Sequence, residues 1–149
     1  MRAAIDELAA TAGGRRVAVL GDMLELGREA PRMHREIGEH ASARGVDVLV
    51  GVGELAAQSA AAFAAARQRT AQSAAGEIHT TADAREAAGV LAALVRDGDT
   101  VLVKGSRGVG LELVAQRLRE ERAPLGADAA AVAGARAGAP ALSAGAERR

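Results

Sequence analysis

The sequence predicts a doubly wound α/β domain, in which a mostly parallel sheet carries helices on both faces, followed by a disordered tail. Short apolar runs rich in valine and leucine alternate with longer segments of helical periodicity along residues 1–122. Continuously apolar strands of this kind are typical of parallel sheets buried on both faces. Residues 123–149 consist largely of Ala, Gly and Pro, so we expect them to bury too little area to offset the cost of ordering them.

Four short segments have the composition of strands. Residues 16–20 (RVAVL), 46–50 (VDVLV) and 100–103 (TVLV) are strongly β-forming. Residues 77–79 (EIH), the third segment along the chain, form a weaker strand. Three of them run into glycine-containing loops, at residues 21–22, 51–53 and 104–108. Ligands of such sheets bind beyond the C-terminal ends of the strands, so these three loops are the candidate site.

Helical periodicity fills the intervals between the strands. Residues 1–10 form an amphipathic helix, Pro31 suits the first turn of the second helix, and Gly45 suits its end. Thr80 or Thr81 is expected to cap the fourth helix. The expected apolar stripes are Met33, Ile37 and Ala41 in the second helix, Leu55, Ser59, Ala62, Phe63 and Ala66 in the third, Ala84, Ala87, Ala88, Leu91, Leu94 and Val95 in the fourth, and Leu111, Val114 and Leu118 in the last.

Composition narrows the class of protein. The 149 residues carry 19 Lys and Arg against 19 Asp and Glu, so charge gives no reason to expect nucleic acid or an anionic membrane as a partner. Without cysteine there is neither a disulfide nor a thiolate metal site. The first residues lack the order of a signal peptide, and no apolar run reaches the roughly 18 residues of a membrane span. We therefore expect a cytoplasmic protein.

The loop at residues 104–108 is the strongest candidate for a binding site, because a strand leads into KGSRGVG and then into a helix. Its glycines allow a ligand to approach the backbone, and a helix N-terminus favours an anion. Lys104 offers a point charge, Ser106 a hydroxyl donor and Arg107 a bidentate fork, which together suit a carboxylate or a phosphate. The order differs from a P-loop, whose lysine follows the glycines. The alternative is a glycine-rich turn with solvated charges.

The other two loops carry weaker signals. Asp22 either binds an amine or hydroxyl, or only ties down its own turn through an Asx hydrogen bond. Residues 51–56 fit the dinucleotide pattern GxGxxA, but Glu77, at about the spacing of the expected acid, begins its strand instead of ending it, which favours a tight turn. His34, His40 and His79 show no spacing of metal ligands and are interpreted as surface or packing residues.

Four segments together resemble the C-terminal domain of the Mur ligase family. They are GRRVAVLGDMLELG (residues 14–27), HREIGEHA (34–41), VDVLVGVG (46–53) and VLVKGSRGVGLE (101–112). LGDMLELG and VLVKGSRG are similar to the MurF type, which joins D-alanyl-D-alanine to UDP-N-acetylmuramoyl-tripeptide. The resemblance implies a three-domain enzyme whose central domain holds ATP and Mg²⁺ in a P-loop. These residues contain no GxxxxGK[ST], so we expect a fragment, a split gene product or an excised domain that is inactive alone.

The resemblance also implies roles for the candidate residues. Lys104, Ser106 and Arg107 would hold the carboxylate of the incoming dipeptide at the cleft between domains. Asp22 would face the same cleft, toward either the substrate amine or a group of the central domain. A separate chain carrying the other two domains is a possible partner. Two other functions stay open: a free-standing nucleotide- or dinucleotide-binding module that uses residues 51–56, and a non-catalytic relic.

Overall fold

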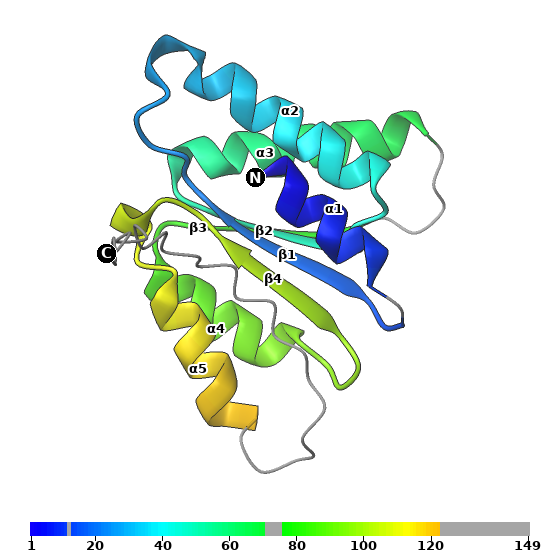
Figure 1. Ribbon diagram of the computed structural model, residues 1–149, viewed down its shortest axis with the longest axis vertical. Helices are drawn as coiled ribbons and strands as arrows, with labels where there is room; N and C mark the ends of the chain where they lie inside the picture. Colours follow the sequence, from blue (N-terminus) through cyan, green and yellow to red (C-terminus); the bar gives the residue numbers. More distant parts are fainter. Residues whose placement is uncertain (12, 71–75, 123–149) are drawn as a thin grey trace, which may run out of the picture.

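A computed structural model describes residues 1–11, 13–70 and 76–122 of the chain (Figure 1). The tail predicted for residues 123–149 lies outside the described residues. No helix within the described ranges is long and apolar enough to cross a membrane.

Four parallel strands form one sheet in the order β3-β2-β1-β4. Their bounds are Arg16–Gly21 for β1, Val48–Val52 for β2, Glu77–Thr81 for β3 and Thr100–Lys104 for β4. In β1, Leu20 pairs with Gly51 on one side and with Lys104 on the other. The C-terminal ends of these strands therefore lie level, which brings the three glycine-containing loops to one edge of the sheet.

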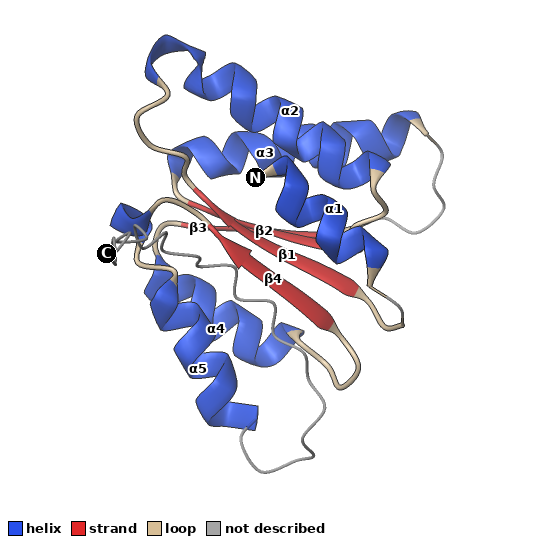
Figure 2. Cartoon of the chain, viewed as in Figure 1, coloured by secondary structure: helices blue, strands red, loops and turns tan. Residues whose placement is uncertain are grey.

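Helices cover both faces of the sheet (Figure 2), which confirms the doubly wound class. One face carries α1 (Arg2–Ala10), α2 (Ala30–Ala43) and α3 (Glu54–Arg69), and the other carries α4 (Ala84–Leu94) and α5 (Glu112–Arg122). Side chains of β1 alternate between the two layers: Val17 and Val19 pack with α4 and α5, while Ala18 and Leu20 pack with α1 to α3. The core is thus two apolar layers built from Val, Leu, Ile and Ala, with Phe63 in the second.

Helices α2 and α3 pack closely at Gly38. A Cβ atom added there would lie 2.0 Å from the backbone oxygen of Ser59. The hydroxyl of Ser59 also donates to the backbone oxygen of His34 (2.7 Å). The missing side chain at Gly38 therefore lets the two helix backbones touch, and a buried hydrogen bond fixes how they are aligned.

Two expectations about the second strand and second helix are wrong. The second strand begins at Val48 instead of residue 46, because the amide of Val46 donates to Ala41 O and so closes the preceding helix. Met33, which was expected on the buried face of α2, is exposed (36%), and His34 lies on that face instead. The polar ring is tolerated there because both of its nitrogens are hydrogen-bonded.

The third and fourth helices also differ from expectation. The buried stripe of α3 includes Ala56 and Ala60 in place of Leu55 and Ala62. The N-cap of α4 is Asp83, whose side chain accepts from the amides of residues 85 and 86, whereas Thr81 is buried at the end of β3. The expectation of Thr80 or Thr81 as the cap is therefore wrong, because both threonines belong to β3 and the carboxylate of Asp83 takes the cap position.

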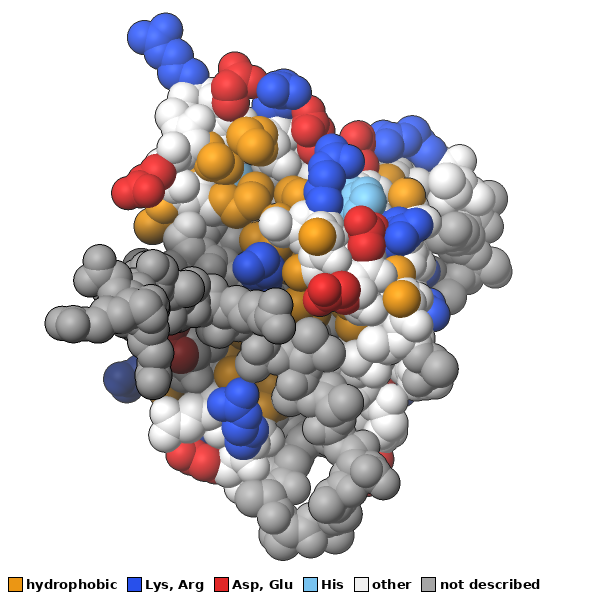
Figure 3. Space-filling view, in the orientation of Figure 1, with side chains coloured by type: hydrophobic (Ala, Val, Ile, Leu, Met, Phe, Trp, Pro, Cys, Tyr) orange, Lys and Arg blue, Asp and Glu red, His pale blue; other side chains and the backbone are white. Residues whose placement is uncertain are grey.

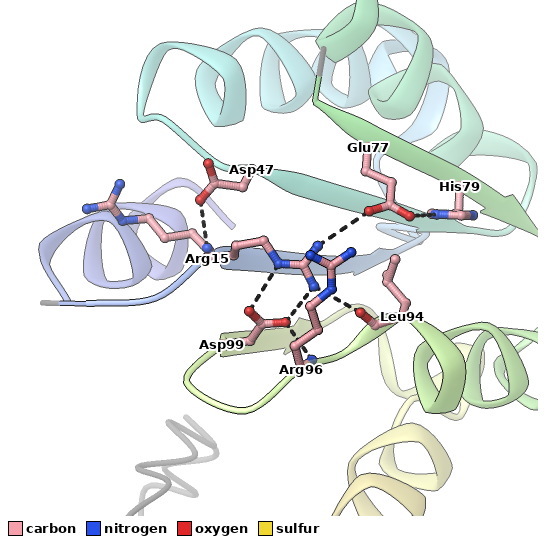
Figure 4. A network of polar contacts seen from close by, with 8 residues as sticks. Arg15, Asp47, Glu77, His79, Leu94, Arg96 and Asp99 are labelled. Carbon is pink, nitrogen blue, oxygen red and sulfur yellow. Dashed lines mark hydrogen bonds and ion pairs between the residues drawn. The ribbon is translucent and has the colours of Figure 1, made fainter. Parts of the chain in front are cut away.

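A polar network joins the elements at the N-terminal edge of the sheet (Figure 4). The guanidinium of Arg15 donates to both carboxylate oxygens of Asp99 (3.1 and 2.8 Å), to Leu94 O (2.9 Å) and to Glu77 (3.4 Å). The amide of Arg96 donates to the same carboxylate (2.8 Å). Burial would raise the pKa of Asp99, but these hydrogen bonds and the charge of Arg15 outweigh it and hold that pKa below its ordinary value.

Candidate functional site

The loops after β1 and β4 are in direct contact at the C-terminal edge of the sheet. A Cβ atom added to Gly105 would lie 2.9 Å from the Cα atom of Gly21, so the two backbones approach closely where neither residue has a side chain. The amide of Ser106 donates to Asp22 O (3.0 Å), and the amide of Leu24 donates to Ser106 Oγ (2.9 Å). Two of the predicted site residues, Asp22 and Ser106, are therefore linked through the backbone.

The hydroxyl of Ser106 already serves as an acceptor within the fold. Its Oγ accepts the Leu24 amide, which leaves the hydroxyl proton to donate elsewhere. A single turn of 3-10 helix, Arg107–Val109, follows, and α5 begins at Glu112 after Gly110 in the left-handed region (φ 71°). The expected direct passage from loop to helix is thus interrupted by this turn.

Lys104 and Arg107 supply positive charge on either side of Ser106. Lys104 is the last residue of β4 and lies on the same face of the sheet as Leu102, which packs with α1. Burial of the Met1 amino group, and then the charge of Lys104, lower the pKa of that amine, as expected for a lysine facing α1. Arg107 is exposed on the 3-10 turn. Within the part of the chain that the structure describes, neither cation pairs with a carboxylate.

The Asp22 side chain caps helix α3 and does not tie down its own turn through an Asx hydrogen bond. Its Oδ1 accepts the amide of Ala56 (2.7 Å) in the first turn of α3. Gly53, at φ 104°, lies against this carboxylate, and an added Cβ atom there would be 2.5 Å from Asp22 Oδ2. The carboxylate thus satisfies an N-terminal donor of α3 and complements the helix dipole.

The position of Asp22 bears on the nucleotide-binding interpretation of residues 51–56. In dinucleotide-binding folds a phosphate occupies the N-terminus of the helix that follows the glycines. Here the Asp22 carboxylate occupies that place at α3, and its negative charge would repel a phosphate. These residues do not fit a nucleotide phosphate at this loop. The described residues also include no group of three His, Cys, Asp or Glu side chains placed to hold a metal ion.

His34 is part of this edge, although the sequence suggested only a surface or packing role. The ring is buried (1% exposed), and its Nε2 lies 2.9 Å from the amide nitrogen of Met23. Its Nδ1 lies 2.7 Å from Ala30 O. The spacing of His34, Ile37 and Ala41 is that of one helix face, and this signal, which was attributed to Met33 instead, could have placed the ring inside.

One exposed apolar side chain adjoins the site, since a Cβ atom added to Gly108 would lie 3.1 Å from Cδ1 of Leu24. Leu24 is 46% exposed and Met33 is 36% exposed, although both are large hydrophobic residues. Figure 3 shows apolar side chains gathered beside α2. The loop that carries Asp22 therefore combines backbone hydrogen bonds to its neighbours with one exposed apolar side chain, that of Leu24.

Comparisons with known proteins agree with this architecture. The family model described as "Mur ligase, glutamate ligase domain" matches residues 1–107. The UDP-N-acetylmuramoyl-tripeptide--D-alanyl-D-alanine ligase of Escherichia coli is 34% identical over 122 residues, which are 80% of this chain and 24% of that protein. The Synechocystis enzyme of the same name is 36% identical over 121 residues, which are 81% and 25% of the two chains.

Solved structures give the same result. MurF from Acinetobacter baumannii superposes with a TM-score of 0.65 at 27% identity, covering 80% of this chain and 25% of that one. MurF ligase from Thermotoga maritima in complex with ADP superposes with a TM-score of 0.59 at 28% identity, covering 78% and 24%. The chain thus spans about a quarter of the length of the relatives it matches.

Proposed function

Since this chain belongs to the Mur ligase family, as its C-terminal domain, we propose that it is the acceptor-binding part of an ATP-dependent amide ligase. The reaction would join D-alanyl-D-alanine to UDP-N-acetylmuramoyl-tripeptide in peptidoglycan synthesis, as the names of the similar enzymes state for them. The observation that carries the proposal is the loop of residues 104–108, where two cations that pair with no carboxylate among the described residues flank a serine held by the neighbouring loop.

The chemistry of the acceptor suits this loop. D-alanyl-D-alanine has a carboxylate at one end and an amine at the other, and the amine must reach the activated carboxyl group of the peptide. Lys104, Ser106 and Arg107 would bind the carboxylate by a point charge, a hydroxyl and a guanidinium fork. Holding one end of the dipeptide orients the other, which lowers the entropic part of the barrier.

Asp22 has a narrower role in this proposal than its charge first suggests. One carboxylate oxygen accepts the amide of Ala56, so Oδ2 is the oxygen with more capacity for a substrate ammonium. Its chief contribution would be to fix the first turn of α3 beside the loop of residues 104–108. The ATP and Mg²⁺ sites would lie mainly in the central domain of the complete ligase. The loop of residues 51–53 would not add a phosphate site, because the Asp22 carboxylate already occupies the N-terminus of α3.

The proposal predicts that the 149 residues alone neither hydrolyse ATP nor form an amide bond, since they contain no P-loop. Purified protein would be incubated with ATP, Mg²⁺, UDP-N-acetylmuramoyl-tripeptide and D-alanyl-D-alanine, with heat-treated protein as the control. Phosphate release that depends on the substrates would show that this part of the proposal is wrong.

A fusion tests the function directly and separates it from a non-catalytic relic. Residues 1–122 would replace the matching C-terminal quarter of the Escherichia coli ligase. We expect ATP-dependent ligation of D-alanyl-D-alanine but not of L-alanyl-L-alanine. The controls are the intact ligase and the same ligase lacking its C-terminal quarter. A folded fusion that is no more active than the truncated control would support the relic instead.

A further inference from the structure

The segment that follows β1 is held by three neighbouring elements at once. Three consecutive backbone N–H groups each donate to a different one: Asp22 to Val52 O of β2 (3.2 Å), Met23 to Nε2 of His34 in α2 (2.9 Å), and Leu24 to Oγ of Ser106 (2.9 Å). A loop fixed in this way cannot shift at one residue without straining its contacts to the other two elements.

The hydrogen bonds of His34 define its protonation state. Its Nε2 faces the Met23 amide, which can only donate, so Nε2 must accept and carries no proton. The proton is therefore on Nδ1 and is donated to Ala30 O, which makes the ring neutral. Asymmetric bonding of this kind fixes both the tautomer and the plane of the ring.

The backbone that carries His34 is itself fixed from the other side. The hydroxyl of Ser59 in α3 donates to His34 O (2.7 Å), one turn from the close contact at Gly38. Helix α3 is in turn capped by the Asp22 carboxylate. Asp22 and Met23 are thus adjacent in sequence and are attached to α3 and α2 respectively, and the two helices are bonded to each other.

This closed set of contacts reaches the proposed acceptor loop at Ser106. Its amide donates to Asp22 O and its Oγ accepts from Leu24, so two of its hydrogen bonds end on residues that flank Met23, while its carbonyl oxygen accepts the Val109 amide within its own turn. We infer that His34 is a positioning residue of the acceptor site: it fixes Met23, and through Asp22 and Leu24 it holds Ser106 in place to receive the dipeptide carboxylate. The inference rests on the proposed function and assigns His34 no contact with substrate.

Packing alone does not account for an imidazole at this position. The neighbouring residues on the buried face of α2 are Ile37 and Ala41, and an apolar side chain would suit the same layer. An apolar side chain in place of the buried His34 ring would leave the Met23 amide without an acceptor. The distinct contribution of His34 is therefore the acceptor that it presents to the loop.

The test compares His34→Phe and His34→Leu, which remove the acceptor, with His34→Gln, which restores one. Ile37→Val is the control, because it removes a core methyl group from the same helix and touches none of these hydrogen bonds. Amide exchange and amide chemical shifts of the ¹⁵N-labelled 149-residue chain are measured at Met23, Leu24 and Ser106. The chain is then titrated with D-alanyl-D-alanine.

We expect His34→Phe or His34→Leu to speed exchange at Met23 and Leu24 by about tenfold, the effect of losing one hydrogen bond. The chemical shift of the Ser106 amide should change and the affinity for the dipeptide should fall. In His34→Gln, the exchange rates should stay within about twofold of those of the wild type. The inference is overturned if only Met23 responds and Leu24 and Ser106 behave as they do in Ile37→Val.

Two further outcomes stay informative. If the wild-type chain shows no response to the dipeptide, the carboxylate assignment of the proposed function is wrong, and the exchange rates alone decide whether His34 positions the loop. If neither loss variant folds, the ring ¹⁵N shifts of the wild type decide instead. A proton on Nε2 would contradict the inference, and a proton on Nδ1 with Nε2 as acceptor would support it.

Discussion

Asp99 gives the sharpest prediction about stability, because both of its carboxylate oxygens act only as acceptors. Oδ1 accepts from Arg15 Nε, and Oδ2 accepts from Arg15 Nη2 and from the Arg96 amide. In Asp99→Asn the amide nitrogen must face at least one of these donors. The side chain is 3% exposed, so water cannot readily replace the lost partner.

The size of the effect follows from these contacts. Removing one partner of a buried ion pair costs about 3–5 kcal/mol, but Arg15 is 25% exposed and keeps its bonds to Leu94 O and Glu77. We therefore expect a loss of about 2–3 kcal/mol in the free energy of unfolding. With an unfolding entropy of about 2.1 cal/mol/K per residue, this corresponds to a fall in Tm of about 8–12 °C.

The assay is urea and thermal unfolding of the wild type and Asp99→Asn between pH 3 and pH 7. Because the folded pKa of Asp99 is lowered, the carboxylate stabilises the fold above its unfolded pKa of about 3.9, and this contribution is lost as pH falls through the folded pKa. The difference between the two proteins should be constant above about pH 5 and shrink below about pH 4.

The matched control is Glu77→Gln in the same network. Glu77 is 42% exposed and lies 3.4 Å from Arg15, so its loss should cost at most about 1 kcal/mol. A cost for Asp99→Asn as small as that of Glu77→Gln, or a difference that grows on acidification, would refute the reasoning.

Three further changes have defined outcomes. Gly38→Ala should lower the free energy of unfolding by about 1–3 kcal/mol, because the added methyl group meets Ser59 O; unchanged thermal unfolding would mean that α2 and α3 can separate without cost. Asp22→Ala should cost about 0.5–2 kcal/mol and speed amide exchange at Ala56; protection of that amide as in the wild type would rule out the cap. Ending the chain at Arg122 should change stability by no more than about 0.5 kcal/mol in urea unfolding, and a larger loss would show that residues 123–149 contribute to the fold.

The sheet could be predicted from the sequence because parallel strands buried on both faces appear as apolar runs. The first residue of the second strand could not be predicted, since valines stand on both sides of Asp47, at residues 46 and 48. Only the structure shows that the Val46 amide closes α2, while the Asp47 carboxylate accepts the Arg16 amide beside the start of β1. Apolar character locates a strand, and backbone hydrogen bonds set its ends.

The candidate loops were predictable for a similar reason, because glycines after apolar runs identify the C-terminal edge of the sheet. The contacts of Asp22 and His34 were not. Their partners are the backbone amides of Ala56 and Met23, and a backbone amide is the same at every residue except proline. The sequence therefore does not indicate which backbone amide each side chain will contact in the fold.

The most direct test of the proposed acceptor site measures kinetics in the fusion with the Escherichia coli ligase, for Lys104→Ala and Arg107→Ala. A charge-assisted hydrogen bond to a carboxylate contributes about 1.5–3 kcal/mol, so each change should lower kcat/KM for D-alanyl-D-alanine by roughly 10-fold to 150-fold. The KM for ATP and the Tm should barely change, since both side chains lie in a loop or at its edge and make no ion pair within the described residues. An effect that falls chiefly on the KM for ATP, or early melting with normal kinetics, would contradict the assignment of this loop to the dipeptide carboxylate.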